Sequence, residues 1–430
     1  MKLLVIDQDC CGLDFCLRAL AYGHEVKLFL AKKKNGEVDL SGNGLVDKVT
    51  EYAPWMKWAD LVFLTSNTRY IGDLEFYREK YPNKIFGPNK ASAALEIDRK
   101  LGMDIMEVSG IDIPHYESFD SLKEAERYAL KTPGRLVFKL MGDADDKAMS
   151  YVANSPADMA QTIREWIKEG KALKGQCMLQ EFIPGIEMGV SGWFGPGGWT
   201  GHWCENFEHK KFMSGNYGYN TGEMGTVLAY TRKSKLAEEV LEPLTDHLLK
   251  IGYVGDVDVN CIIPDGDPAL PLELTCRPGW PSHVIQSSLH KGDDIEWRAD
   301  LLNGDDTLDV DFSIATGVVI AIRKEIDGLP VYGITDENIE HVHPFELMLG
   351  RALDMVDEKP VERDMYVSSG DYLCVVTGHG KTVSESAKNA FAVVDEIKVK
   401  DMIVRDDIGE CLEKQLPELH KQGYATHFKY

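Results

Sequence analysis

The stretch GNYGYNTGEMGTV, residues 215–227, is rich in glycine and leads directly into β-forming residues. Its glycines are Gly215, Gly218, Gly222 and Gly225, and they alternate with the polar residues Asn216, Asn220, Thr221 and Glu223. Glycine costs backbone entropy and adds no side-chain packing. A loop with four of them is therefore expected to turn tightly or to approach a bound molecule closely.

Towards the amino terminus, strand patterns alternate with helical ones. The apolar runs are KLLVID (2–7), HEVKLFLA (24–31), ADLVFLTSN (59–67) and KIFGPNK (84–90). This alternation predicts a parallel, doubly wound sheet over residues 1–90. Open parallel sheets bind ligands at the carboxyl ends of their strands. The first such end is DQDCCGLD, residues 7–14.

Residues 116–180 form a β–α–β–α–β pattern small enough to be a lid. Lys139 lies in its strand LVFKLMG, with apolar residues on both sides. A lysine is expensive to bury unpaired. On the residues alone, Lys139 either points outward from a half-exposed strand or meets a phosphate.

Two strand patterns, 254–263 and 270–277, flank the turn PDGDPA and predict a hairpin. Side chains alternate along strands, so Asp258 and Glu273 are expected on one face. Neighbouring carboxylates repel each other unless a cation lies between them, and Mg²⁺ is a natural occupant beside phosphates. A solvated sheet face with alternating acids remains the alternative.

The composition is that of an ordinary globular chain with an acidic balance. Its 430 residues carry 47 Lys and Arg against 70 Asp and Glu, a formal net charge of −23. Such a surface disfavours nucleic-acid binding, which needs Lys and Arg against phosphates. No run of about 18 apolar residues predicts a membrane helix. Nine scattered cysteines without CxxC spacing indicate a reducing cytoplasm.

The order of these parts is more specific than any one of them. A doubly wound domain, a lid with a lysine, a connecting strand, a glycine-rich loop and an acidic hairpin resemble the ATP-grasp ligases. Within them the chain resembles the phosphoribosylamine–glycine ligases of purine synthesis. The matching segments are FGPNKASAALE (86–96), GIDIP (110–114), EFIPGIEMGVSGWF (181–194), EHKKFMSGNYGYNTGEMG (208–225) and SESAKNAFAVVDEIKVKDMIVRDDIG (384–409).

The resemblance implies an α/β ATP-grasp fold with a C-terminal α+β domain. The expected divisions are a Rossmann-like domain (1–90), an ATP-grasp domain (91–115 and 181–310), its lid (116–180) and the C-terminal domain (311–430). It also implies a ligase that uses ATP with Mg²⁺, or Mn²⁺ in its place. A carboxylate such as glycine would attack the γ-phosphorus, and an amine would then displace phosphate from the acyl phosphate.

The resemblance also assigns expected roles to residues. The residues expected to bind the nucleotide are Arg99, Lys100, Lys139, Lys147, Glu181, Ile183 and Glu187. From the strand pattern alone, Glu181–Ile183 and Glu187 could instead belong to an ordinary sheet. The metal falls to Asp258, Glu273 and Thr275, and the chemistry to Arg277, Asn220 and Thr221. The substrates fall to Asp7, Asp9, Asn220, Gly222 and Gly225.

Several segments depart from the family pattern. The first loop, DQDCCGLD, has three aspartates and one glycine where the family has a glycine-rich loop, and it makes a poor phosphate cradle. The lid loop reads GDADDKAMS, the metal motif has Thr275 in place of an asparagine, and RPGWPS keeps only Arg277. We therefore expect an altered amine acceptor. The family's own reaction and a non-catalytic ATP-binding relative are the alternatives.

Overall fold

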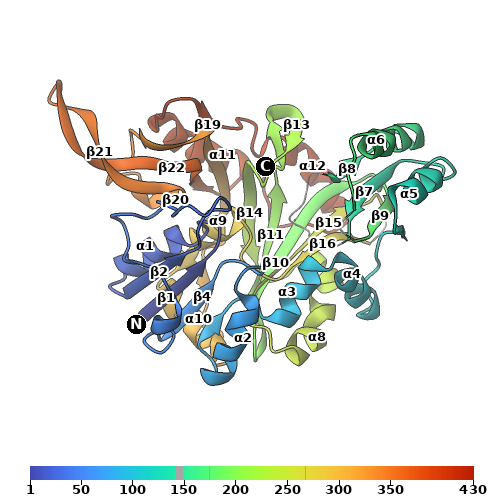
Figure 1. Ribbon diagram of the computed structural model, residues 1–430, viewed down its shortest axis with the longest axis horizontal. Helices are drawn as coiled ribbons and strands as arrows, with labels where there is room; N and C mark the ends of the chain where they lie inside the picture. Colours follow the sequence, from blue (N-terminus) through green and yellow to red (C-terminus); the bar gives the residue numbers. More distant parts are fainter. Residues whose placement is uncertain (142–148, 174, 267) are drawn as a thin grey trace.

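A computed structural model describes residues 1–141, 149–173, 175–266 and 268–430. Figure 1 shows a central body, a lid at one side and a projecting hairpin at the other. No helix in these four ranges is long and apolar enough to cross a membrane.

The amino-terminal sheet is parallel, with strand order β3-β2-β1-β4-β5, which confirms the doubly wound prediction. Its strands are β1 (Lys2–Asp7), β2 (Glu25–Leu30), β3 (Lys48–Val49), β4 (Leu61–Leu64) and β5 (Ile85–Phe86). Its helices are α1 (Leu13–Ala21) and α2 (Ile71–Lys80), with a 3-10 turn at Ala53–Trp55. Strands β1 and β4 are almost wholly buried, as their continuous apolar runs require.

Two consecutive helices, α3 (Lys90–Ile97) and α4 (Arg99–Val108), lead from this sheet towards the lid. Asp98 separates them, because its carboxylate accepts the N–H of Leu101 and caps the second helix. Arg99 therefore stands at the first turn of α4. This position places Arg99 beside the cleft between the lid and the body.

The lid is an antiparallel sheet with strand order β6-β9-β7-β8 and two covering helices. Its elements are β6 (Tyr116–Phe119), α5 (Leu122–Ala129), β7 (Leu136–Leu140), β8 (Tyr151–Val152), α6 (Pro156–Lys168) and β9 (Cys177–Glu181). Phe138 and Trp166 centre a small hydrophobic core of its own, with ring centroids 4.8 Å apart. The lid therefore packs around its own core as a compact unit (Figure 1).

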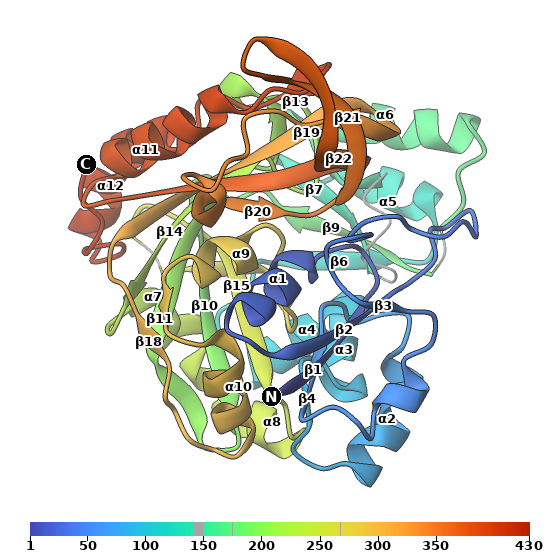
Figure 2. The ribbon, with the colours of Figure 1, turned by 90° about the vertical axis from the view of Figure 1, so that its left-hand side faces the viewer.

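A long antiparallel sheet forms the body, with order β16-β15-β10-β11-β14-β19-β22-β20. Its strands are β10 (Ile186–Gly195), β11 (Gly198–Glu208), β14 (Gly225–Thr231), β15 (Gly255–Ile263), β16 (Leu270–Thr275), β19 (Ile314–Pro330), β20 (Val342–Pro344) and β22 (Lys359–Gly380). Strand β21 (Leu347–Val356) pairs with β22 to form the projecting hairpin, and β23 (Met402–Ile403) pairs with β19 (Figures 1 and 2). The predicted hairpin, β15–β16, is confirmed, and β10 with β11 forms a second one.

The remaining elements cover this sheet or join its strands. The helices are α7 (Lys235–Val240), α8 (Thr245–Lys250), α9 (Ser282–Ser287), α10 (Asp294–Leu302), α11 (Val383–Glu396) and α12 (Glu410–Lys421). The short strand pairs are β12 (Lys211–Met213) with β13 (Tyr217–Asn220), and β17 (His290–Lys291) with β18 (Asp309–Val310). Further 3-10 turns span Ser214–Asn216, Glu242–Leu244 and Ile339–His341.

The body sheet crosses the expected boundary at residues 310–311, because β14 pairs with β19 and Val227 faces Thr316. The central and C-terminal segments thus share one sheet. The division of the chain into domains remains a proposal.

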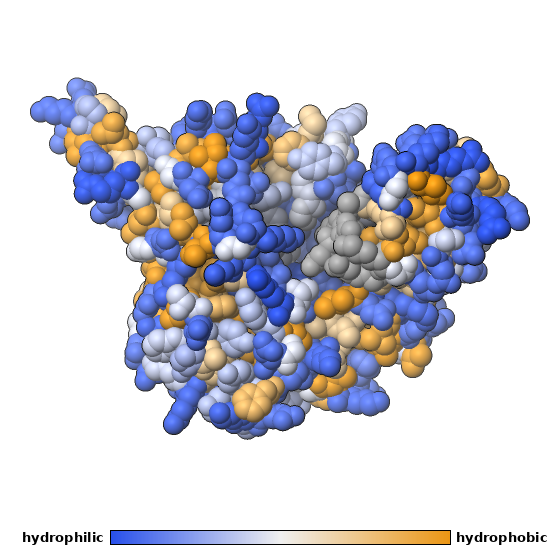
Figure 3. Space-filling view, viewed as in Figure 1, coloured by the Kyte–Doolittle hydropathy of each residue, from blue (hydrophilic) through white to orange (hydrophobic). Residues whose placement is uncertain are grey.

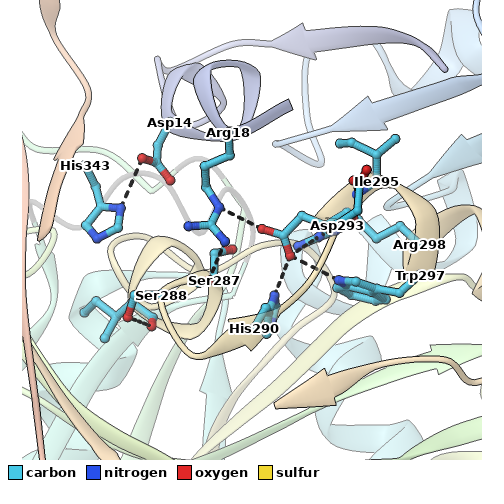
Figure 4. Close-up of polar contacts among 12 residues, drawn as sticks. Asp14, Arg18, Ser287, Ser288, His290, Asp293, Ile295, Trp297, Arg298 and His343 are labelled. Atoms are coloured by element: carbon cyan, nitrogen blue, oxygen red, sulfur yellow. Dashed lines mark hydrogen bonds and ion pairs between the residues drawn. The ribbon is translucent and has the colours of Figure 1, made fainter. Parts of the chain in front are cut away.

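Helix α1 is fastened to the body by buried charges (Figure 4). Asp294 accepts from Arg18 at 2.8 Å, from the His290 ring at 2.7 Å and from Arg298 at 3.1 Å. These partners hold the pKa of the buried Asp294 carboxyl well below its usual range, although burial alone would raise it. Figure 4 also shows His343 turned towards Asp14, at 3.0 Å. Charges therefore lock the amino-terminal domain to the segments on either side.

We predict that Asp294→Ala lowers the free energy of unfolding by about 3–5 kcal/mol, because it leaves Arg298 buried without its counter-charge. Urea denaturation would measure the change. Glu296→Ala on the exposed side of the same helix is the matched control, with an expected loss under about 1 kcal/mol. Equal losses in the two variants would contradict the structural role assigned to the Asp294 cluster.

Candidate active site

A cleft separates the lid from the body sheet, and we call it the lid cleft. Its lining residues are Arg99, Val137, Lys139, Leu140, Ser150, Val152, Gln180, Glu181, Phe182, Ile183, Glu187, Lys210, Asn220, Thr221, Ile262, Leu272 and Glu273. Figure 3 shows this face of the molecule hollowed between the lid and the body. The cleft brings Glu181, Ile183 and Glu187 together with Lys139, and their role in nucleotide binding remains a prediction.

Lys139 points into the lid cleft. Its Nζ donates to the carbonyl of Leu272, on the opposite wall, at 3.4 Å. Burial lowers the pKa of this ammonium to about 7, and the neighbouring Arg99 acts in the same direction. The outward orientation left open by the sequence is therefore wrong. The protonated form of Lys139 is thus disfavoured by burial, and a nearby anionic ligand would stabilise it.

Arg99 and Lys100, the two basic residues at the start of α4, lie in different surroundings. Arg99 lines the lid cleft and donates to the Leu272 carbonyl at 3.3 Å. Lys100 lies outside the lining and pairs with Asp104, one helical turn along, at 2.5 Å with both side chains about half exposed. The geometry favours Arg99 for nucleotide binding and does not favour Lys100. Lys147 lies outside the described residues.

The acidic hairpin has the predicted face but a shifted register. Asp258 stands opposite Thr275, and Glu273 stands opposite Asn260. Asp258 and Glu273 are therefore diagonal neighbours rather than a directly facing pair. The pairing shifts by one residue between Asn260 and Cys261, and side-chain alternation alone could not specify this irregularity.

Lys210 occupies the centre of the acidic face. Its Nζ lies 2.9 Å from Glu187, 2.9 Å from Glu208 and 3.3 Å from Glu273. These carboxylates keep the pKa of Lys210 well above its usual range despite burial. Lys210 and Glu208 were not among the site residues predicted from the sequence. The charged segment EHKK (208–211), shortly before the glycine-rich loop, could have indicated them.

The same face has features of a cation site beyond Lys210. Asp258 accepts from the Asn206 amide at 2.8 Å, and its pKa is raised well above the usual range by burial and by Glu208. The buried Oδ1 of Asn260 has no hydrogen-bond partner within the described part of the chain. Oxygen donors beside uncompensated negative charge suit Mg²⁺. Among the described residues, however, no three His, Cys, Asp or Glu side chains are grouped to hold a metal without help from a substrate.

The glycine-rich loop joins the lid cleft to a second cavity. Asn220 and Thr221 line the cleft, and Thr221 donates its N–H and its hydroxyl to the Lys210 carbonyl at 2.8 and 3.0 Å. Gly222 lines the second cavity. Gly215, with φ of +70°, lies in the turn between β12 and β13, and Gly218, with φ of +82°, lies within β13.

Gly225 serves packing instead of substrate binding. It is buried at the start of β14, and a Cβ there would lie 2.6 Å from the Gly317 carbonyl oxygen. It lines neither the lid cleft nor the second cavity. The expectation that Gly225 contacts substrate is not supported, because its missing side chain is needed for the approach of β14 to β19.

The second cavity, here the loop pocket, lies at the carboxyl ends of β1 and β4, where the parallel sheet predicted a ligand site. Its lining residues are Gln8, Asp9, Cys11, Thr65, Ser66, Thr68, Gly222, Arg277, Pro278, Trp280, Phe345, Glu346 and Tyr372. The amino-terminal, central and C-terminal segments all contribute. Phe345, Tyr372 and Glu346 come from segments that the sequence patterns did not connect with this site.

Of the first loop's three aspartates, only Asp9 lines the loop pocket. Asp7 is fully buried and accepts from the Gly12 N–H and the Thr65 hydroxyl, each at 2.7 Å, so it shapes the loop from beneath. Asp14 is paired with His343. The assignment of Asp7 to substrate binding is therefore not supported by its position.

Arg277 lies between the loop pocket and a smaller cavity that shares Arg99, Leu272 and Glu273 with the lid cleft. It donates to Glu96 at 2.7 Å and lines the loop pocket, and it also lines this smaller cavity together with Arg99, Glu273 and Thr275. The sequence predicted a role for Arg277 between phosphate and acceptor. Its position is consistent with that role, which remains a prediction together with those of Asn220 and Thr221.

Comparisons with known proteins agree with this architecture. Residues 98–282 match the family described as phosphoribosylglycinamide synthetase, ATP-grasp (A) domain. The chain is 28% identical over 352 residues to the bifunctional purine biosynthetic protein PUR2,5 of Pichia angusta, covering 78% of this chain and 43% of that longer protein. It is 25% identical over 340 residues to phosphoribosylamine–glycine ligase of Fusobacterium nucleatum, covering 76% and 78% of the two chains.

The solved structure of phosphoribosylamine–glycine ligase from Thermotoga maritima superposes with a TM-score of 0.72 at 18% identity, covering 95% of this chain and all of that one. The fold, the family match and the relatives define this chain as an ATP-grasp ligase of the class that forms carbon–nitrogen bonds. Within that class it is a divergent relative of phosphoribosylamine–glycine ligase.

We predict that Lys210→Met lowers the melting temperature by several degrees, because it leaves three carboxylates without their cation. If those carboxylates belong to a divalent-cation site, MgCl₂ at constant ionic strength should raise the melting temperature more in Lys210→Met than in wild type. Differential scanning calorimetry would measure both effects. Lys100→Met is the control variant. If MgCl₂ raises the melting temperature of Lys210→Met no more than that of Lys100→Met, the Lys210 cluster does not bind the metal.

Proposed function

We propose that this chain is an ATP-dependent carboxylate–amine ligase whose amine acceptor carries no phosphate. ATP would occupy the lid cleft, with its phosphates near Lys139 and Arg99 and its adenosine near Glu181, Ile183 and Glu187. The carboxylate substrate, an amino acid such as glycine, would lie at the junction beside Arg277. The amine would lie in the loop pocket.

The reaction would proceed in two displacements. A carboxylate oxygen attacks the γ-phosphorus, the bond to the β-bridging oxygen breaks, and ADP and an acyl phosphate form. The amine nitrogen then attacks the acyl carbon, phosphate leaves, and the nitrogen loses a proton. Lys139, Arg99 and Arg277 would stabilise the phosphoryl oxygens, while the loop at Asn220 and Thr221 would position the reacting groups.

Glu273 and Asp258 would hold Mg²⁺, with Thr275 beside them, and the ion would neutralise charge on the ATP phosphates. The raised pKa of Asp258 and the unpartnered Asn260 Oδ1 support a cation at this face. Lys210 already neutralises part of the same cluster. The Lys210 side chain would therefore either move when the ion binds or remain in place as a second positive charge that faces the phosphates.

The acidity of the loop pocket carries the proposal of an altered acceptor. Asp9 and Glu346 line it, and its described lining contains one cation, Arg277, which is already paired with Glu96. A carboxylate about 4 Å from a phosphate would cost about 4 kcal/mol at an effective dielectric constant of 20. A neutral or cationic amine avoids that repulsion.

The names of the relatives favour a second candidate, the family's own reaction with glycine and phosphoribosylamine. The two candidates differ in the acceptor alone. They share the lid cleft, the acidic hairpin and the chemistry.

The deciding experiment measures phosphate release with ATP, Mg²⁺ and glycine, together with either freshly generated phosphoribosylamine or a panel of unphosphorylated amines. We expect release that requires both the carboxylate and an unphosphorylated amine. Glu273→Gln, the control, should reduce this release by orders of magnitude without a change in melting temperature. Turnover of phosphoribosylamine at about 1 s⁻¹ or faster would restore the family's own reaction. Absence of release with every pair of substrates would indicate a non-catalytic relative.

A further prediction concerns protons. Free Lys139 loses its proton as the pH rises through about 7, and nearby phosphates would raise its pKa. ATP binding at neutral pH should therefore take up about half a proton at Lys139, and ATP affinity should fall as the pH rises above 7. Calorimetry in buffers of different ionisation enthalpy would measure the uptake.

Lys139→Arg is the matched control for the proton measurement, because arginine stays charged. It should keep a positive charge in the lid cleft while losing the proton uptake assigned to Lys139. Equal uptake in wild type and Lys139→Arg would place the titrating group elsewhere.

A further inference from the structure

We propose that the amine acceptor bears a cationic end group, and that Trp280, Phe345, Tyr372 and Glu346 bind this group. The inference rests on the proposed ligase function and names the acceptor's class. We call these three aromatic side chains the aromatic cage. Each of them lines the loop pocket.

The cage is built from rings at right angles. The Trp280 and Phe345 centroids lie 5.5 Å apart with planes at 77°, and the Trp280 and Tyr372 centroids lie 5.2 Å apart with planes at 87°. Rings that meet at right angles form a corner against which a compact group can sit. Aromatic faces carry partial negative charge and attract ammonium groups, most strongly when water is excluded.

Trp280 comes from RPGWPS, one of the segments in which this chain departs from its relatives. The glycine-rich loop packs on it, since a Cβ at Gly222 would lie 3.3 Å from Trp280 Cζ3. Its buried Nε1–H has no acceptor within the described ranges of the chain. A bound molecule with an oxygen beside its cationic group would supply one.

Glu346 provides a fixed counter-charge. One carboxylate oxygen accepts the backbone N–H groups of Asp371 and Tyr372, both at 2.7 Å. Gly370 makes room for it, because a Cβ there would lie 2.2 Å from the Glu346 carboxyl carbon. The backbone of β22 is thus shaped around this carboxylate.

The surroundings of Glu346 are negative. Burial raises the pKa of its carboxyl to about 7, and the nearby Asp371 and Asp39 act in the same direction. Asp9 lines the other side of the pocket, while Arg277 is paired with Glu96. A cationic group would therefore meet the Glu346 carboxylate and aromatic walls, whereas an anionic group would meet repulsion.

Choline and its neutral isostere 3,3-dimethyl-1-butanol are suitable probes, because they match in shape and differ in charge. Titration calorimetry on the full chain should show choline binding about tenfold or more tighter than the isostere. Trp280→Leu and Glu346→Gln should each remove most of that difference. Trp55→Leu, outside the loop pocket, is the matched control and should bind like wild type.

Equal binding of the two probes by wild type, absence of choline binding, or competition of inorganic phosphate for the same site would each overturn the proposal. The wild-type comparison does not depend on any variant folding. Phosphate release with glycine and the amine panel is measured in parallel. If phosphate is released but choline does not bind, the aromatic cage is rejected and the ligase function is retained. If no phosphate is released with any of these substrates, the ligase function itself is rejected.

Discussion

The close approach of β14 to β19 at Gly225 and Gly317 sets the position of the glycine-rich loop. A side chain at Gly225 would meet the Gly317 carbonyl, and one at Gly317 would lie 2.2 Å from Ile285. Gly225 therefore lets β14 pair with β19 in one sheet, and Gly317 lets α9 pack on that sheet. The preceding loop then leaves this sheet with Thr221 at the lid cleft and Gly222 at the loop pocket. Conformational freedom and close packing, both properties of glycine, act together here.

Charge balance distinguishes the two cavities. In the lid cleft, Lys139, Arg99 and Lys210 face a group of carboxylates, so cations and anions are both at hand for a phosphate-bearing substrate and its metal. Among the described residues that line the loop pocket, Arg277 is paired with Glu96, and the other charged side chains are acidic. An enzyme that joins two substrates can in this way favour a polyanion in one cavity and an amine in the other.

Buried ion pairs hold the parts in register without taking part in the chemistry. Asp294 ties α1 to α10, and Asp14 ties α1 to β20 through His343. Because such charges are costly to expose or to leave unpaired, they fix orientation more strictly than an apolar contact of similar area. The first loop, which follows β1 and enters α1, is consequently held over the loop pocket.

Much of the fold could be predicted from the sequence, because it depends on local patterns. Continuous apolar strands between helices indicated the parallel sheet, and the turn PDGDPA indicated the hairpin β15–β16. Strand patterns and motif order also proposed Lys139, Glu181, Ile183 and Glu187 as residues of one nucleotide site. They gather in one cleft because their strands are neighbours in the fold.

Relations between distant segments required the tertiary structure. The sequence determined that acids and a lysine lie near the glycine-rich loop, but only folding decided that Lys210 stands among Glu187, Glu208 and Glu273, which come from three strands. Likewise, nothing local distinguishes Asp7 from Asp9. The chain reversal after β1 turns Asp7 under its own backbone and leaves Asp9 at the pocket. Side-chain alternation and turn chemistry act over a few residues, whereas a binding site depends on which distant segments pack together, and that is a property of the whole core.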